Sequence, residues 1–441
     1  MTGEGGCPFP GHISRRRLLG GLGLAGAGVA LGAGGVALGA GGMAGSMALA
    51  GAAGAATAAD GGVTGSGGAG ANRMYPFYDD HQAGIVTPAQ DRLAFAAMNV
   101  LPGTTRSDVR TLLRDWTVAA ERMTRGKLVG EDTDLNDPPL DTGEAIGSPV
   151  GGLTVTIGYG PSLFDDRFGL AKKKPSLLVD LPPLPNENLN PTYTGGDLCI
   201  QACSDDPLVA FHAVRNLARL GLGVVDYNWM ELGFGRTSTT STTEATPRNL
   251  LGFKDGTRNI KAQQTDLLDK YVWVGDETDQ DWLKGGSYLV ARRIQIFIEN
   301  WDRDYLGDQQ NVIGRAKVTG APLTGGGEFT TPKFKEKNDQ GELVIPANAH
   351  IRLASHEEND GIRILRRGYS FTDGIDPVRG TLMGGLFFIA FAKRPQQFIA
   401  LQQKLGTGDA LNEYIQHIGS GLFAVQGGLR RGQHWGDGLF A

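Results

Sequence analysis

The chain has 441 residues, 40% of them hydrophobic and 20% charged, with 42 basic and 47 acidic side chains. This mild acidity argues against a nucleic-acid partner, and a total of three cysteines excludes a fold held together by a disulfide framework. The length is enough for two domains of ordinary size, so we expect a soluble, globular protein.

Residues 1–59 have the composition of a targeting segment. Three consecutive arginines, at 15–17, precede a weakly apolar run that is rich in glycine and alanine. A membrane-spanning helix needs about 20 predominantly apolar residues, and glycine dilutes this run too far to form one. We therefore predict a twin-arginine signal, which a receptor recognises. A low-complexity N-terminus is the alternative.

The twin-arginine pathway exports proteins in folded form, so the mature chain is expected to be extracellular, periplasmic or associated with the cell envelope. Loss of residues 1–59 removes three arginines and one glutamate and leaves a formal charge of −7. Residues 60–74 read as a flexible linker that is rich in glycine, serine and alanine.

Amphipathic spacing predicts helices in the rest of the chain, and alternating or continuously apolar runs predict strands. The expected helices span 91–101, 104–124, 206–220, 301–315 and 411–418, and the expected strands span 151–159, 198–202, 224–230, 288–297 and 384–391. Helices and strands do not alternate strictly along the chain, which favours an α+β fold. We expect two similar halves, each a sheet with helices on one face. Polar stretches at 131–146, 236–249 and 319–340 are expected to be surface loops.

Cys199 and Cys203 lie four residues apart, in a segment expected to run from a strand into a loop. Cys7 would leave with the signal. Two buried thiols are the expected state of the remaining pair, and a bridge between them is the alternative.

The motif Gly252-Phe253-Lys254-Asp255-Gly256-Thr257-Arg258 follows the second polar loop and sets an acid between two glycines. Glycine adopts backbone conformations that are closed to other residues, so Asp255 is a candidate for a functional carboxylate. An Asx-turn, in which Asp255 bonds to its own backbone, explains the motif equally well.

Of seven histidines, His350 is the best candidate for a metal ligand, because small residues lead to it and an alternating strand is expected to begin there. A lone histidine in such a place is more often structural. Arg366 follows an apolar pair sixteen residues later, where a charged sheet edge would also explain it. The other histidines lie in the signal, in loops near the ends of the mature chain, on expected helices or in an acidic turn: His12, His81, His434, His212, His417 and His356.

An aspartate, a histidine and an arginine together are what peroxide chemistry at a haem requires. The histidine holds the iron, and a carboxylate bonded to its other nitrogen raises its donor strength. The aspartate moves a proton from the inner to the outer oxygen of the peroxide. The arginine, which is always charged, stabilises the negative charge that develops as the O–O bond breaks.

Through these residues the chain resembles the dye-decolourising peroxidases, and in particular the exported bacterial branch that includes the deferrochelatase-type proteins. The family's Gly-x-x-Asp-Gly motif matches residues 252–256, with Asp255 as its acid. Its proximal histidine segment, Ala/Ser-His-Ile/Val-Arg-Leu, matches residues 349–353 around His350, and its distal arginine falls on Arg366. The similarity extends from residue 75 to the C-terminus.

The resemblance implies further contacts with the haem, from an apolar pair over the distal pocket and from the acid motif: Leu386, Phe388, Gly256 and Thr257. Glu413 matches the acid expected beside the proximal histidine, with Asp409 left open as the alternative. Arg367 likewise stays open as the distal arginine.

The resemblance also implies two ferredoxin-like domains, residues 75–237 and 238–441, with antiparallel sheets and helices packed on one face. One haem b per chain would be held mainly by the second domain. The implied activity is a peroxidase that reduces hydrogen peroxide and oxidises dyes and phenols through a ferryl intermediate. The implied partners are peroxide, an organic reducing substrate and iron-uptake or other exported proteins, with oligomerisation left open.

Two other functions are considered beside this one. A haem-handling protein, which releases iron from the porphyrin or carries haem, also needs His350 and the same pocket, but a pure carrier has no need of the pair of Asp255 and Arg366. Chlorite conversion on a related fold is disfavoured by Asp255. Because a dye would not enter a narrow distal pocket, electrons from the dye are expected to reach the haem through aromatic residues near the surface. The candidates are Trp301, Trp273, Trp282 or Tyr369. The alternative is that these are core or rim residues.

Overall fold

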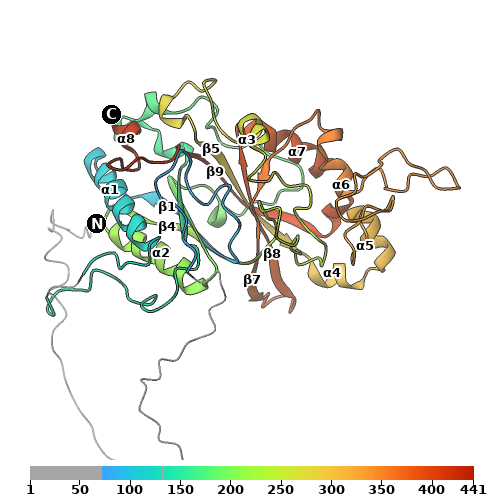
Figure 1. The fold of residues 1–441 in the computed structure, drawn as a ribbon, viewed down its shortest axis with the longest axis horizontal. Coiled ribbons are helices and arrows are strands. Elements are labelled where there is room, and N and C mark those ends of the chain that lie inside the picture. The colour runs from blue at the N-terminus through green and yellow to red at the C-terminus, as the bar shows by residue number, and fades with distance from the viewer. Residues whose placement is uncertain (1–71, 132–133) are drawn as a thin grey trace, which may run out of the picture. The chain divides into compact units, whose positions relative to one another are not determined.

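The computed structural model describes residues 72–131 and 134–441 (Figure 1). The first half of this part contains β1 (Arg92–Val100), α1 (Arg106–Met123), β2 (Thr154–Tyr159), β3 (Leu198–Ser204), α2 (Pro207–Leu220) and β4 (Val225–Arg236). The second half contains α3 (Thr265–Tyr271), β5 (Ser287–Ile296), α4 (Ile298–Arg303), α5 (Leu306–Ile313), α6 (His350–Leu353), β6 (Leu365–Arg366), β7 (Tyr369–Ile375), β8 (Leu382–Ala392), α7 (Pro395–Gly408), β9 (Ile415–Val425) and α8 (Asp437–Phe440). The predicted signal, residues 1–59, and most of the predicted linker lie outside the described residues.

Each half has the strand order of a ferredoxin-like unit. In the first half the antiparallel strands lie in the order β2-β3-β1-β4, and α1 and α2 are the two helices of the βαββαβ pattern. In the second half the order is β9-β5-β8-β7, with α7 between β8 and β9. The long segment from α4 to β6 takes the place of the first helix here. The expected α+β fold of two ferredoxin-like units is confirmed.

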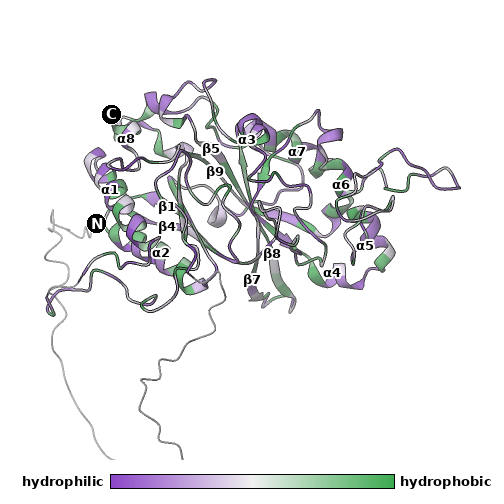
Figure 2. Ribbon diagram, in the orientation of Figure 1, coloured by the Kyte–Doolittle hydropathy of each residue, from purple (hydrophilic) through white to green (hydrophobic). Residues whose placement is uncertain are grey.

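The two sheets join into one closed layer of strands. β4 pairs with β7, and β2 meets β9 at Tyr159 and Ala424, so the order returns to its start through the pairing of β5 with β8. Side chains from both halves fill the interior, where the ring of Phe95 lies 5.1 Å from that of Phe387 and 6.2 Å from that of Phe423. The central strands are accordingly mostly green in Figure 2.

Three of the expected elements are wrong. Residues 91–101 form β1 rather than a helix, because this strand is covered by α1 and α2 on one face and by the interior on the other. A strand buried on both faces is a continuous apolar run without alternation. The expected helix 411–418 is a 3₁₀ turn, Ala410–Glu413, followed by β9, and the strand expected after His350 is the short helix α6. The expected helix 301–315 is divided into α4 and α5, whereas the other expected helices and strands are present.

Cys199 and Cys203 are buried free thiols on β3. Residues four apart on a strand are separated by roughly 13 Å, which is beyond the reach of a disulfide. The expected pair of thiols is therefore confirmed. Within the described ranges, none of the helices has the length and apolar character needed to cross a membrane.

Candidate active site

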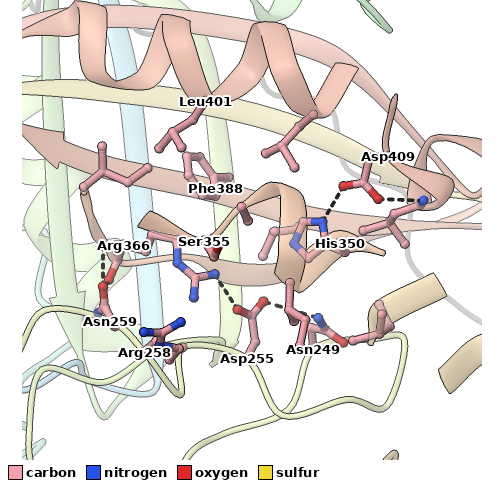
Figure 3. A pocket seen from close by; sticks show the side chains of 18 of the residues that line it. Asn249, Asp255, Arg258, Asn259, His350, Ser355, Arg366, Phe388, Leu401 and Asp409 are labelled. Atoms are coloured by element: carbon pink, nitrogen blue, oxygen red, sulfur yellow. Dashed lines mark hydrogen bonds and ion pairs between the residues drawn. The ribbon is translucent and has the colours of Figure 1, made fainter. Parts of the chain in front are cut away.

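A cavity of about 260 Å³ lies in the second half, over the face of β5, β8 and β9 that points away from the interior. Its walls come from the loop around Asp255, from α6 and from α7. Figure 3 shows Asp255, Arg366 and His350 around one space, with Phe388 and Leu401 on another side. A largely apolar lining with a few converging polar groups is typical of a site for a small molecule or cofactor.

A tight loop brings Asp255 to the cavity. Gly252 and Gly256 have φ angles of +81° and +82°, and a Cβ on Gly256 would lie 2.8 Å from the Cα of Ser238, so a larger residue would be strained there. The Asp255 carboxylate accepts hydrogen bonds from Asn249 Nδ2 at 3.2 Å and from Arg366 Nη1 at 2.6 Å. Side chains rather than its own backbone bind this acid, in contrast to the Asx-turn alternative.

The structure places Arg366, and not Arg367, at the cavity. Arg366 lies in the short strand β6, which pairs with β8 at Ala390, and its side chain reaches Asp255. Arg367 is buried on the opposite side, where it donates to the main-chain oxygen of Thr87 and to the side chain of Gln90. Successive side chains of an extended segment point to opposite faces, so only one of the two arginines can face the cavity.

His350 begins α6, and its Nδ1 lies 2.6 Å from Oδ2 of Asp409. Asp409 is buried, follows the end of α7 and also accepts a hydrogen bond from the main-chain N–H of Leu411 at 2.9 Å. A carboxylate on Nδ1 orients the imidazole and leaves Nε2 as the nitrogen for a ligand or metal.

The match of Glu413 with the acid beside His350 is wrong. Glu413 is exposed and does not line the cavity. Asp409 caps the start of the 3₁₀ turn and so points back toward α6, whereas Glu413 ends the same turn on its solvent side.

Opposing influences act on the pKa of His350 and leave it raised. Burial lowers this pKa, but the charge and hydrogen bond of Asp409 raise it, with Asp255 adding to the increase and Arg366 opposing it. The imidazole therefore lies within electrostatic reach of both polar side chains on the far side of the cavity.

Alternation along β8 produces the apolar floor of the cavity. Phe387 turns to the interior, whereas Leu386 and Phe388 line the cavity. A buried histidine of β9, His417, also lines it, and the Nδ1 of this residue accepts a hydrogen bond from Arg292 Nε at 3.1 Å. Burial, together with the charge of Arg292, lowers the pKa of His417 to about 3, so this imidazole is neutral near neutral pH.

The residues fit a haem whose iron has a single protein ligand. Across 72–131 and 134–441, no group of three or more His, Cys, Asp or Glu side chains is placed to hold a metal ion alone. His350 offers one nitrogen whose donor strength Asp409 increases, and the apolar floor suits a porphyrin. Gly256 and Thr257 line the same cavity, so Glu413 is the only predicted contact among these described residues that lies outside it.

Sequence reasoning missed several polar groups at the site. Asn249 and Asn259 bind Asp255 and Arg366, and Gln402 lies at the cavity beside His417. Asn249 lies six residues before Asp255 and Asn259 four residues after it, so the acid motif was a local signal for both. Gln402 comes from α7 and meets His417 of β9 at the cavity, a tertiary contact that a pattern along the chain does not reveal.

The four aromatic residues expected to carry electrons are mostly core residues. Trp301, Trp273 and Tyr369 are buried, and Trp282 is half-buried. Trp301 is the one connected with the cavity, because its ring lies 5.9 Å from that of Phe253, a lining residue.

Two family models match the chain. The model described as Dyp-type peroxidase, N-terminal, matches residues 82–235, and the one described as Dyp-type peroxidase, C-terminal, matches residues 246–430. The interval between the matches falls in the Ser/Thr-rich loop that leads to Asp255.

Relatives resemble the chain over both halves. The deferrochelatase of Escherichia coli K12 is 37% identical over 366 residues, which are 81% of this chain and 85% of that protein. The structure of an oxyferrous complex of DtpA from Streptomyces lividans is 37% identical, with a TM-score of 0.77 over 84% of this chain and 99% of DtpA. A DyP-type peroxidase from Cellulomonas bogoriensis is 34% identical, with a TM-score of 0.76 over 84% of this chain and 99% of its own.

Proposed function

Because the chain belongs to the Dyp-type peroxidase family, whose members are haem enzymes, we propose that Asp255, Arg366 and His350 carry out the reduction of hydrogen peroxide in this cavity. The observation that carries the proposal is the ion pair of Asp255 with Arg366, at 2.6 Å, in the same cavity as the carboxylate-bound His350. A haem carrier has no need of such a pair.

The bound haem supplies the iron and the electrons for cleavage of the peroxide bond. His350 would hold the iron through Nε2, because Asp409 occupies Nδ1 and orients the imidazole. Asp255 accepts the proton of the incoming peroxide and returns it to the departing oxygen, which leaves as water; such proton transfer contributes on the order of 10²- to 10⁴-fold in rate. Arg366 stabilises the negative charge on that oxygen through its permanently charged guanidinium.

A second candidate function is the release of iron from haem, which the name of the 37% identical Escherichia coli relative favours. Both functions require His350, so they differ in products rather than in the haem site. Peroxidase turnover yields an oxidised dye or phenol, whereas iron release yields free iron and metal-free porphyrin.

The two functions are distinguished by assaying residues 60–441 after reconstitution with haem. We expect peroxide-dependent oxidation of an anthraquinone dye and of a phenol, with turnover lowered on the order of 10²-fold or more in Asp255→Ala. The same samples are examined for porphyrin fluorescence and for iron captured by a chelator. Release of iron and porphyrin without dye oxidation would overturn the peroxidase proposal in favour of iron release.

We also propose that the chain is exported in folded form by the twin-arginine pathway. The three arginines at 15–17 and the apolar run behind them support this proposal. Replacing all three arginines by lysine should retain the protein in the cytoplasm of a host with that pathway. An unchanged distribution between cell fractions would contradict the proposal.

A further inference from the structure

The main chain of Arg366 is held from both sides. On one side it pairs with Ala390 of β8. On the other side the side-chain amide of Asn259 acts like a neighbouring strand, because Asn259 Nδ2 donates to Arg366 O at 2.8 Å and Asn259 Oδ1 accepts from Arg366 N–H at 2.8 Å. β6 is only two residues long, so these two bonds are a large part of what holds it.

Ser238 adds a third bond to the main chain of Arg366. Its hydroxyl donates to Arg366 O at 2.8 Å. Asn259 is 6% exposed and Ser238 is 2% exposed, so water does not compete for these bonds. Hydrogen bonds in such an environment are stronger than exposed ones and hold their groups more rigidly.

The residues that hold Arg366 belong to the loop that carries Asp255. The N–H of Asn259 donates to Gly256 O at 3.0 Å, and the backbone of Gly256 packs directly on Ser238. One short piece of chain therefore presents the acid and also binds the main chain of the arginine. The 2.6 Å contact between Asp255 and Arg366 is thereby fixed at both of its ends.

We propose that Asn259, assisted by Ser238, is a positioning residue that fixes Arg366 against Asp255 for the reaction with peroxide. The proposal rests on the proposed function of that pair. An amide suits the position because it offers a donor and an acceptor together, whereas an aspartate would set a carboxylate oxygen against the carbonyl of Arg366. Displacing a reacting group by about 1 Å costs on the order of 10²-fold in rate, so loss of the amide should be felt at the cavity.

The test uses Asn259→Ala, Asn259→Asp and Ser238→Ala, with Asn216→Ala as the matched control. Asn216 is a buried asparagine of α2 that bonds to Thr142 and to the main chain of His212, far from the cavity in the fold. Amide hydrogen exchange of Arg366 is measured in the haem-free protein, and the rate of reaction with hydrogen peroxide and the haem affinity are measured after reconstitution.

In Asn259→Ala we expect exchange at Arg366 to accelerate about fivefold or more, as loss of a hydrogen bond predicts. The peroxide rate should fall on the order of 10- to 100-fold while haem affinity stays at the parent value, because His350 and Asp409 are untouched. Asn259→Asp keeps the acceptor for Arg366 N–H, so exchange at Arg366 should change little. It sets a carboxylate oxygen against the carbonyl of Arg366, so the peroxide reaction should still slow. Ser238→Ala should show a smaller effect in the same direction.

Unchanged exchange in Asn259→Ala, or faster exchange with the parent peroxide rate, would overturn the proposal. An equal loss of rate in Asn216→Ala would also overturn it, because general destabilisation would then suffice. Arg366→Ala separates this failure from that of the proposed function. If Arg366→Ala itself reacts at the parent rate, the role of the pair is wrong, whatever the exchange measurement says of Asn259.

Discussion

Replacing Asp409 by asparagine tests which acid supports His350. Asp409 lies 2.6 Å from the imidazole with its side chain 3% exposed, whereas Glu413 is exposed. A hydrogen bond to a charged group contributes about 1.5–3 kcal/mol. The His350 side chain is 32% exposed where it borders the cavity, so screening should keep the loss from exceeding that range. A loss of about 1.4–2.7 kcal/mol is a 10- to 100-fold loss of affinity, as is usual for residues that orient a metal ligand.

The assay is a titration of haem into the haem-free protein, followed by the Soret absorbance. Asp409→Asn should bind haem about 10- to 100-fold more weakly than the parent chain. Glu413→Gln makes the same change of acid to amide four residues later and should bind like the parent. Equal affinity of the two variants and the parent would refute the role of Asp409, as would a loss confined to Glu413→Gln.

Three further perturbations test other parts of the site. Trp301→Phe should slow dye oxidation without changing the peroxide step, because the Trp301 ring contacts both Phe253, at the cavity, and Tyr414, with ring centroids 5.9 and 4.9 Å away. Trp273→Phe is the control, and dye turnover equal to the parent in both variants would rule out the relay. Gly256→Ala should lower the melting temperature of the haem-free protein, because a residue with a Cβ is about 1–2 kcal/mol less favourable at the φ of +82° found here. An unchanged melting curve would contradict this strain. The pKa of His417 is about 3 in the fold against an ordinary value of 6.5, so the unfolded chain binds more protons between these values and stability should fall as pH drops from 6.5 toward 3. Denaturant unfolding of His417→Gln should show a weaker fall over this window, and a slope equal to that of the parent would argue against a buried neutral imidazole.

The parts of the site that depend on local chemistry were predictable from the sequence. Asp255 stands between Gly252 and Gly256, which adopt the positive φ angles that the loop requires, so the motif itself indicated the unusual backbone around the acid. The strand over 384–391 was predicted from its continuous apolar run, and the resemblance placed Leu386 and Phe388 at the cavity, where residues two apart on a strand share a face. The resemblance placed His350 at the cavity, although the residues after it form a helix rather than the expected strand.

The parts that depend on tertiary packing were not predictable. Residues 91–101 do not show the alternation that identifies a strand, because β1 is buried on both faces. Asp409 and Glu413 lie in one short segment, and only the end of α7 decides which carboxylate turns back to His350. Asn259 lies near the acid motif, but its bonds to Arg366 span 107 positions of the chain, a separation over which no local pattern carries information.

Mixing haem-loaded residues 60–441 with one equivalent of hydrogen peroxide, and following the Soret band by stopped flow, tests the roles of Asp255 and Arg366 most directly. Asp255→Ala and Arg366→Ala should bind haem like the parent and react on the order of 10²-fold or more slowly, whereas His350→Ala should lose the Soret band of the ligated haem. Reaction of both distal variants at the parent rate, with haem bound normally, would contradict the assignment of peroxide chemistry to this pair.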